Sequence, residues 1–103
     1  MASSHLSLRR WFTFYNRKYF GGRLPHDTVL RWEPTGPNDA HALPGVIQLD
    51  PAVKLFPRYM RILLLHEMAH ISVPTRGTGH GARYHDEIQR LWDLGAFRPL
   101  LQE

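Results

Sequence analysis

Apolar residues recur with helical spacing near the start of the chain. Five of them fall at positions i, i+3, i+4, i+7 and i+11: Leu8, Trp11, Phe12, Tyr15 and Tyr19. This spacing predicts an amphipathic helix with one aromatic face. Ser7 is a suitable N-cap for it, and the pair Gly21-Gly22 is expected to end it.

The middle of the chain has strand composition. Residues 28–32 (TVLRW) and 45–49 (GVIQL) each predict a short strand, and residues 34–38 (PTGPN) have the composition of a turn. The two strands either pair as a hairpin or are neighbours joined by a longer loop that contains His41. The sequence therefore predicts a short sheet of two or three strands.

Helical patterns return in the second half. Asp50-Pro51 fits an N-cap and first helical position, and Pro57 separates this turn from a helix predicted over residues 58–71. A glycine-rich loop leads to a last helix over residues 82–94, which ends before Gly95. Its expected inner face consists of Tyr84, Ile88, Leu91 and Trp92. The 103 residues predict one α+β domain, with a core from about residue 8 to residue 96.

Charge is distributed unevenly along a chain whose net charge is +4. No acidic residue precedes Asp27, whereas five basic residues do: Arg9, Arg10, Arg17, Lys18 and Arg23. Such a segment is either a solvated helix face or a surface that attracts phosphates. Arg9, Arg10, Arg17 and Lys18 are therefore candidate contacts to DNA.

Composition also excludes several classes of protein. The chain has no cysteine, which rules out disulfides, thiol nucleophiles and cysteine-based zinc ribbons. Its longest strongly apolar run, residues 62–65, is too short to cross a membrane. The first twelve residues lack the apolar region of a secretory signal. We expect a soluble, cytoplasmic protein.

The chemistry is concentrated in LLLHEMAHI, residues 63–71. On a helix His66 and His70 lie one turn apart on one face, so both imidazoles can reach one metal ion. Glu67 lies about 100° around the axis, where it can contact a metal-bound water without being a ligand. This is the HExxH arrangement of zinc peptidases. The alternative, a buried pair of histidines with a buried unpaired glutamate, would cost several kcal/mol.

A catalytic zinc ion needs a third protein ligand. The positions that metzincins use for it hold Val73 and Arg76, so that pattern fails. The downstream candidates are His80, His85, Asp86 and Glu87. His80 is preferred because Gly79 and Gly81 flank it and allow close approach of the backbone.

Five blocks resemble the SprT-like metallopeptidase domain, in the same order. They are YNRKYFGGRLP (15–25), GVIQLDP (45–51), LLLHEMAH (63–70), GHGARY (79–84) and LWDLGA (91–96). This family includes the Spartan proteases, which degrade proteins crosslinked to DNA. The resemblance implies a small zincin-like domain without a zinc ribbon, with zinc ligands His66, His70 and His80 and the catalytic glutamate Glu67.

These observations predict a zinc endopeptidase with one zinc ion per chain, in which Glu67 is the general base for a zinc-bound water. Tyr84, Arg83 and His85 are secondary candidates, although Tyr84 also fits the core. The strand of Val46, Ile47, Gln48 and Leu49 is a candidate edge for pairing with a protein or peptide substrate. DNA-associated proteins are among the candidate substrates. Two alternatives stay open: a zinc-containing nucleic-acid-binding module, and a zinc hydrolase of a non-peptide substrate.

Overall fold

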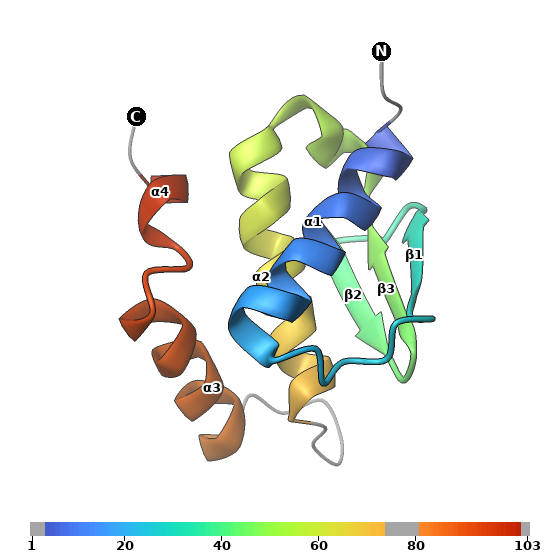
Figure 1. Cartoon of the computed structure of the whole chain (residues 1–103). Helices are drawn as coiled ribbons and strands as arrows, with labels where there is room; N and C mark the ends of the chain where they lie inside the picture. Colours follow the sequence, from blue (N-terminus) through green and yellow to red (C-terminus); the bar gives the residue numbers. More distant parts are fainter. Residues whose placement is uncertain (1–3, 74–80, 102–103) are drawn as a thin grey trace.

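The computed structural model describes residues 4–73 and 81–101, with side chains from Leu8 onward. In this part of the chain the elements follow in the order α1 (Ser4–Phe20), β1 (Val29–Trp32), β2 (Ala40–Leu43), β3 (Val46–Leu49), the 3₁₀ helix η1 (Pro51–Leu55), α2 (Pro57–Ser72), α3 (Ala82–Asp93) and α4 (Arg98–Leu101). Figure 1 shows α2 in the middle, with the sheet on one side and α3 and α4 on the other. The predicted α+β class is confirmed.

Helix α1 buries the aromatic face that its sequence predicts. Leu8, Phe12 and Tyr15 are almost completely buried, and Tyr19 packs at the edge of the core. The helix begins at Ser4, so Ser7 is inside it and the predicted N-cap was wrong. After Phe20 the backbone of Gly21 and Gly22 adopts φ angles of 59° and 74°, a left-handed conformation that favours glycine and ends the helix.

The sheet has the order β1-β3-β2. Strands β1 and β3 pair in parallel, with Val29 opposite Val46, and β2 pairs antiparallel to β3, with His41 opposite Gln48. The predicted strands are thus neighbours rather than a hairpin, because the hairpin partner of β3 is the His41 segment. Gly45, at φ 75° in the tight connection between β2 and β3, makes this reversal possible.

Helix α2 forms the centre of the core. Leu64, Leu65, Met68 and Ala69 are fully buried, and the helix packs against β2 and β3 on one side and α3 and α4 on the other. Asp50 caps η1 by accepting a hydrogen bond from the backbone N–H of Ala52. Pro57 then begins α2, one residue before the predicted start of this helix, because proline fits the first helical position.

The C-terminal part differs from its prediction in three respects, the first of which is the short helix α4, which was not predicted. Trp92 is 53% exposed, and the buried face of α3 consists of Tyr84, Glu87 and Leu91. Trp92 was therefore wrongly assigned to the inner face; it lies next to Leu91 on the helix, where it contacts the ring of Phe97 near the surface. The core also continues past residue 96, to Phe97 and Leu100.

Candidate metal centre

Helix α2 brings the three residues of the HExxH motif together. The ring centroids of His66 and His70 lie 5.2 Å apart, as expected for side chains one turn apart on a helix. Both rings are partly exposed, whereas the neighbouring Leu65 and Ala69 are fully buried. The apolar side of α2 thus anchors the helix in the core and leaves the two imidazoles at its surface.

Glu67 is the buried member of the motif. Its side chain is almost completely enclosed, with 6% of the residue exposed, and its Oε2 lies 3.9 Å from Nε2 of His66. Burial raises the pKa of Glu67 from the ordinary value of 4.5 to about 7, because a carboxylate loses hydration in an enclosed site. A carboxyl with this pKa can both accept and release a proton near neutral pH.

Tyr84 of α3 completes the group from a different part of the chain. Its hydroxyl lies 2.7 Å from Nδ1 and 3.0 Å from Nε2 of His66, and its ring stacks on His70 with centroids 4.2 Å apart. Burial, followed by the negative charge of Glu67, raises the pKa of Tyr84, so this phenol stays protonated in the physiological range. The predicted core position is confirmed, and the same side chain also contacts both histidines.

A polar cluster holds α3 against the end of α2. The buried carboxylate of Glu87 accepts hydrogen bonds from the hydroxyl of Ser72 and from Nε of Arg90, the latter at 2.6 Å. Arg90 also donates to the backbone carbonyl of Tyr19 on α1 at 2.6 Å. The start of α3, and with it Tyr84, is thereby fixed relative to the two histidines. The spacing of Glu87 and Arg90, three residues apart on a helix, was the signal in the sequence.

His66 and His70 offer two of the nitrogen donors that a zinc site requires. Two imidazoles beside a buried carboxylate form a donor set suited to zinc, and among the described residues no Lys or Arg forms an ion pair with Glu67. The residues therefore fit the metal. Within residues 4–73 and 81–101, no third His, Cys, Asp or Glu joins them in a group that could hold an ion.

The candidates for the third ligand differ in their exposure and in their hydrogen bonds. His85 and Asp86 are exposed on α3, and Glu87 is engaged with Ser72 and Arg90. His80, the preferred candidate, lies outside the described residues. Arg83 is exposed and lines a shallow hollow between the end of α2 and α3.

The prediction that residues 46–49 form a substrate-binding edge was wrong. Strand β3 is the central strand, since it pairs with β1 on one side and with β2 on the other. Its backbone groups are therefore used within the sheet and cannot pair with a substrate. The outer strands of the described sheet are β1 and β2, and the sequence of β2, AHAL, gave little indication that it forms a strand.

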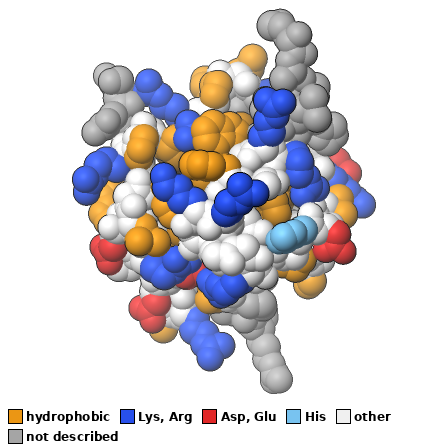
Figure 2. Space-filling view, in the orientation of Figure 1, with side chains coloured by type: hydrophobic (Ala, Val, Ile, Leu, Met, Phe, Trp, Pro, Cys, Tyr) orange, Lys and Arg blue, Asp and Glu red, His pale blue; other side chains and the backbone are white. Residues whose placement is uncertain are grey.

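The four basic residues predicted to contact DNA do not form one uniform surface. Arg9 donates hydrogen bonds to the carbonyls of His26 and Thr28, at 3.3 and 2.7 Å, and so connects α1 to the segment before β1. Arg10, Arg17 and Lys18 are exposed. Figure 2 shows Lys and Arg side chains spread over the face on which α1 lies. No helix in the described part of the chain is long and apolar enough to cross a membrane.

Comparison with known proteins identifies the fold. No family model and no curated protein matches the chain. Among solved structures, the crystal structure of the metallopeptidase zymogen of Pyrococcus abyssi abylysin is similar, with a TM-score of 0.67 and 23% sequence identity. The match covers 90% of this chain and 87% of the abylysin chain. The chain therefore shares its fold with that metallopeptidase zymogen.

Proposed function

We propose that this chain is a zinc-dependent endopeptidase that hydrolyses peptide bonds of protein substrates. The observation that carries the proposal is the arrangement around His66: His70 one turn along α2, the buried carboxyl of Glu67 beside it, and the hydroxyl of Tyr84 within hydrogen-bond distance. The likeness in fold to a metallopeptidase supports it.

His66 and His70 would hold the metal ion, with His80 as the third ligand. The start of α3 lies against the two histidines through Tyr84, so a donor just before α3 in the sequence is the simplest completion of the set. When zinc is bound, it supplies a Lewis acid that acidifies water and polarises a scissile carbonyl. Proton transfer would then be carried out by side chains of the protein.

Glu67 carries that proton transfer. Its carboxylate accepts the proton of the attacking water and passes it to the nitrogen of the leaving amine. In the zinc-free chain burial raises the pKa of Glu67 to about 7, because the carboxylate loses hydration in the enclosed site. Its enclosed position also keeps competing bulk water away from the transferred proton.

Tyr84 positions the histidines. Its hydrogen bond to His66 fixes the orientation of that ring, and its own ring covers one face of His70. Groups that hydrogen-bond to metal-binding histidines set both ring orientation and ligand basicity. Arg83 and His85 are exposed on α3, and the ring of His85 meets that of Tyr84 only edge-on, with centroids 5.9 Å apart.

Strand β2 offers an edge for an extended substrate. It is an outer strand of the described sheet and packs against α2, the helix that bears the two histidines. Main-chain pairing at such an edge binds peptides with little dependence on their sequence. A broad preference among unfolded segments is therefore expected.

The finer assignment is a SprT-like peptidase that acts on DNA-associated proteins in the cytoplasm. The order of the five sequence blocks supports the SprT-like part. Exposed Arg10, Arg17 and Lys18 on α1 are the feature that favours DNA. Acceleration of cleavage by single-stranded DNA, lost at high salt, is the expected result; a rate independent of DNA would remove this part of the proposal alone.

The experiment that tests the function measures zinc content and cleavage of an unfolded protein such as β-casein. The wild-type chain is expected to hold about one zinc ion, to lose activity with a chelator and to regain it with zinc. His66→Ala and His80→Ala are expected to lose zinc, whereas His85→Ala, on the exposed side of α3, keeps it. His85 is the matched control because it lies near the site without contacting either histidine of α2.

The alternatives predict different results. A nucleic-acid-binding module would hold zinc and bind single-stranded DNA without cleaving any protein. A hydrolase of a non-peptide substrate would hold zinc and turn over a phosphate ester but not casein. A wild-type chain that folds without zinc and cannot be loaded with it would contradict all three readings.

A further inference from the structure

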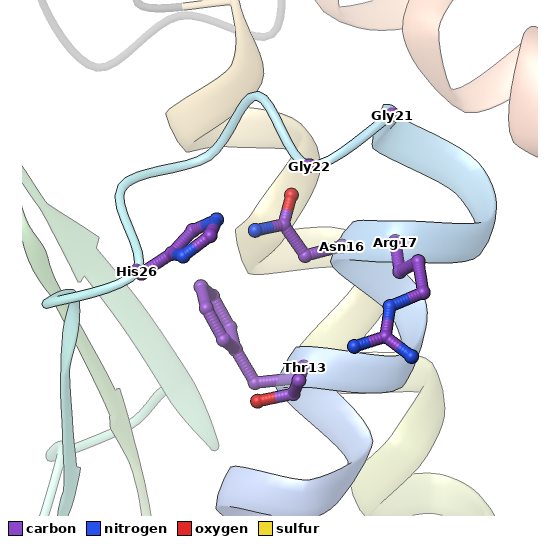
Figure 3. Close-up of a pocket in the computed structure, with 7 residues that line it drawn as sticks. Thr13, Asn16, Arg17, Gly21, Gly22 and His26 are labelled. Atoms are coloured by element: carbon purple, nitrogen blue, oxygen red, sulfur yellow. The ribbon is translucent and has the colours of Figure 1, made fainter.

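A second hollow lies away from the histidines, between α1 and the segment that connects α1 to β1. Its volume is about 290 Å³, and its polar lining comes from Thr13, Asn16 and Arg17 of α1 and from His26 of the connecting segment. In Figure 3 His26 points toward α1, Asn16 and Thr13 lie on the side of the helix that faces it, and the side chain of Arg17 extends along the helix toward Thr13. We call this hollow the α1 pocket.

The wall of the α1 pocket that bears His26 is held in place by hydrogen bonds. Buried Asn16 accepts from the N–H of Leu24 at 3.1 Å and donates to its carbonyl at 3.0 Å. Two residues later, the carbonyl of His26 accepts from Arg9, which also donates to the carbonyl of Thr28 at 2.7 Å. The segment is therefore attached to α1 on both sides of His26, so a ligand would find the pocket already formed.

The lining of the α1 pocket is cationic. None of its residues is acidic, and the chain has no acidic residue before Asp27. No hydrogen bond or ion pair joins the side chains of Arg17 or His26 to other residues in the described part of the chain. A guanidinium fork, an imidazole and the hydroxyl of Thr13 together offer donors in several directions, which suits a group with more than one oxygen acceptor.

We propose that the α1 pocket binds a small organic anion through a phosphate or carboxylate group. Arg17 would make the charge-assisted contact, with His26 and Thr13 as further donors. Phe12 also borders the hollow but is 1% exposed, so the polar side chains would supply the contacts to the ligand. The volume is close to the lower limit of roughly 300 Å³ for small-molecule sites, which indicates a ligand of metabolite size rather than a polymer.

The test is an NMR titration of the full chain with inorganic phosphate and, separately, with acetate, at constant ionic strength maintained with sodium chloride. Saturable shifts of the amides of Thr13, Arg17, Gly22 and His26 are expected with at least one of the two. Arg17→Gln should weaken this binding about tenfold or more, the loss expected for a charged hydrogen bond. Arg10→Gln removes the same charge from an exposed position of α1 that does not line the pocket, and should leave binding unchanged.

The two probes also distinguish the chemistry of the ligand. Saturation with phosphate alone indicates a phosphate ester, and saturation with acetate indicates a carboxylate; either supports the pocket. Shifts that do not saturate with either probe would overturn the proposal. Equal weakening by Arg10→Gln and Arg17→Gln would also overturn it, because it would reflect the net charge of α1 rather than a site. None of these outcomes depends on zinc or on peptidase activity.

Discussion

Glu67 on α2 and Glu87 on α3 are carboxylates with almost the same exposed fraction, 6% and 7%, yet their pKa values are shifted in opposite directions. Burial raises the pKa of Glu67 to about 7. Burial acts on Glu87 as well, but hydrogen bonds from Arg90 and Ser72 and the charges of Arg90 and Arg23 outweigh it, so the pKa of Glu87 is lowered.

This difference separates a group available for chemistry from one that holds the fold together. Glu87 has its negative charge neutralised and its oxygens bonded by donors from α2 and α3, so it has little capacity left for another proton. Among the residues that the structure describes, no Lys or Arg neutralises Glu67, which lies beside two imidazoles. A buried, uncompensated carboxyl is costly to the fold, and such costs are typical of functional sites.

The largest expected effect is on catalysis. Glu67→Gln keeps the size of the side chain but removes the proton acceptor, so the rate of casein cleavage should fall by roughly 10²- to 10⁴-fold with zinc content unchanged. Glu33→Gln is the matched control, because it makes the same chemical change at an exposed position after β1. Cleavage by Glu67→Gln at more than a tenth of the wild-type rate would contradict the assignment of Glu67 as the base.

The next effect concerns the stability of the zinc-free chain as a function of pH. Because the pKa of Glu67 rises from 4.5 in an unfolded chain to about 7 in the fold, the folded state binds this proton more tightly. The resulting stabilisation is fully present below pH 4.5 and is lost as the pH rises through 7. The free energy of unfolding should fall by about 3 kcal/mol across this interval.

Urea unfolding of chelator-treated protein at several pH values measures this loss. Glu67→Gln has no proton to lose, so the difference between its stability and that of the wild type should change by the same amount over the interval. Parallel pH profiles for the two proteins would show that the carboxyl of Glu67 titrates normally, and the contrast with Glu87 would disappear.

Glu87→Gln tests the other half of the comparison. The substitution removes a negative charge that Arg90 and Ser72 bond directly, and it should lower the free energy of unfolding at pH 7 by roughly 2 kcal/mol. Because the pKa of Glu87 is lowered, its stabilisation is present above the ordinary pKa and is lost as the pH falls through the folded value. The loss caused by the substitution should therefore shrink in acid.

Asp86→Asn is the control for Glu87→Gln. Asp86 is the adjacent acidic residue of α3 and is exposed, so its replacement should change stability by less than about 0.5 kcal/mol. Urea unfolding measures both effects. If the two substitutions change the free energy of unfolding equally, the change reflects the net charge of the protein rather than the hydrogen bonds around Glu87.

The three long helices, α1, α2 and α3, could be predicted from the sequence because their signals are local, whereas the short α4 was not predicted. The apolar spacing of α1, the Asp50-Pro51 cap and Pro57 lie within the segments that they organise, and Gly95, at φ 82°, stops α3 where expected. Strand β2 could not be predicted in this way. Its four residues, AHAL, have little strand preference, and they form a strand because the connection at Gly45 places them beside β3.

In the candidate site, too, the contacts within one helix could be predicted from the sequence and the contacts between helices could not. His66, Glu67 and His70 share one helix, so their spacing alone predicts that they lie together. The contacts of Tyr84 with His66 and of Glu87 with Ser72 join residues 18 and 15 positions apart in the chain. Those contacts depend on how α3 packs against α2, which no local pattern specifies. Trp92 was misplaced for this reason, since the packing of α3 buries Glu87 and exposes Trp92.

The smallest expected effect concerns Tyr84, which connects the two helices at the site. Tyr84→Phe keeps the ring that stacks on His70 and removes only the hydroxyl that lies 2.7 Å from Nδ1 of His66. The fold should be retained, but the orientation of His66 would be less restricted. Because loss of a hydrogen bond to a metal-binding histidine typically weakens metal binding by 10- to 100-fold, zinc affinity should fall by about tenfold in competition with a chromophoric chelator.

Tyr59→Phe provides the control for this last measurement. Tyr59 on α2 also has a bonded hydroxyl, which donates to Asp39 at 2.6 Å, but the bond does not involve either histidine. If Tyr84→Phe and Tyr59→Phe bind zinc equally tightly, the hydroxyl of Tyr84 does not position His66. In that case α3 would contribute to the site through the stacked ring of Tyr84 alone. The proton transfer assigned to Glu67 would then be the chemistry that the described residues supply.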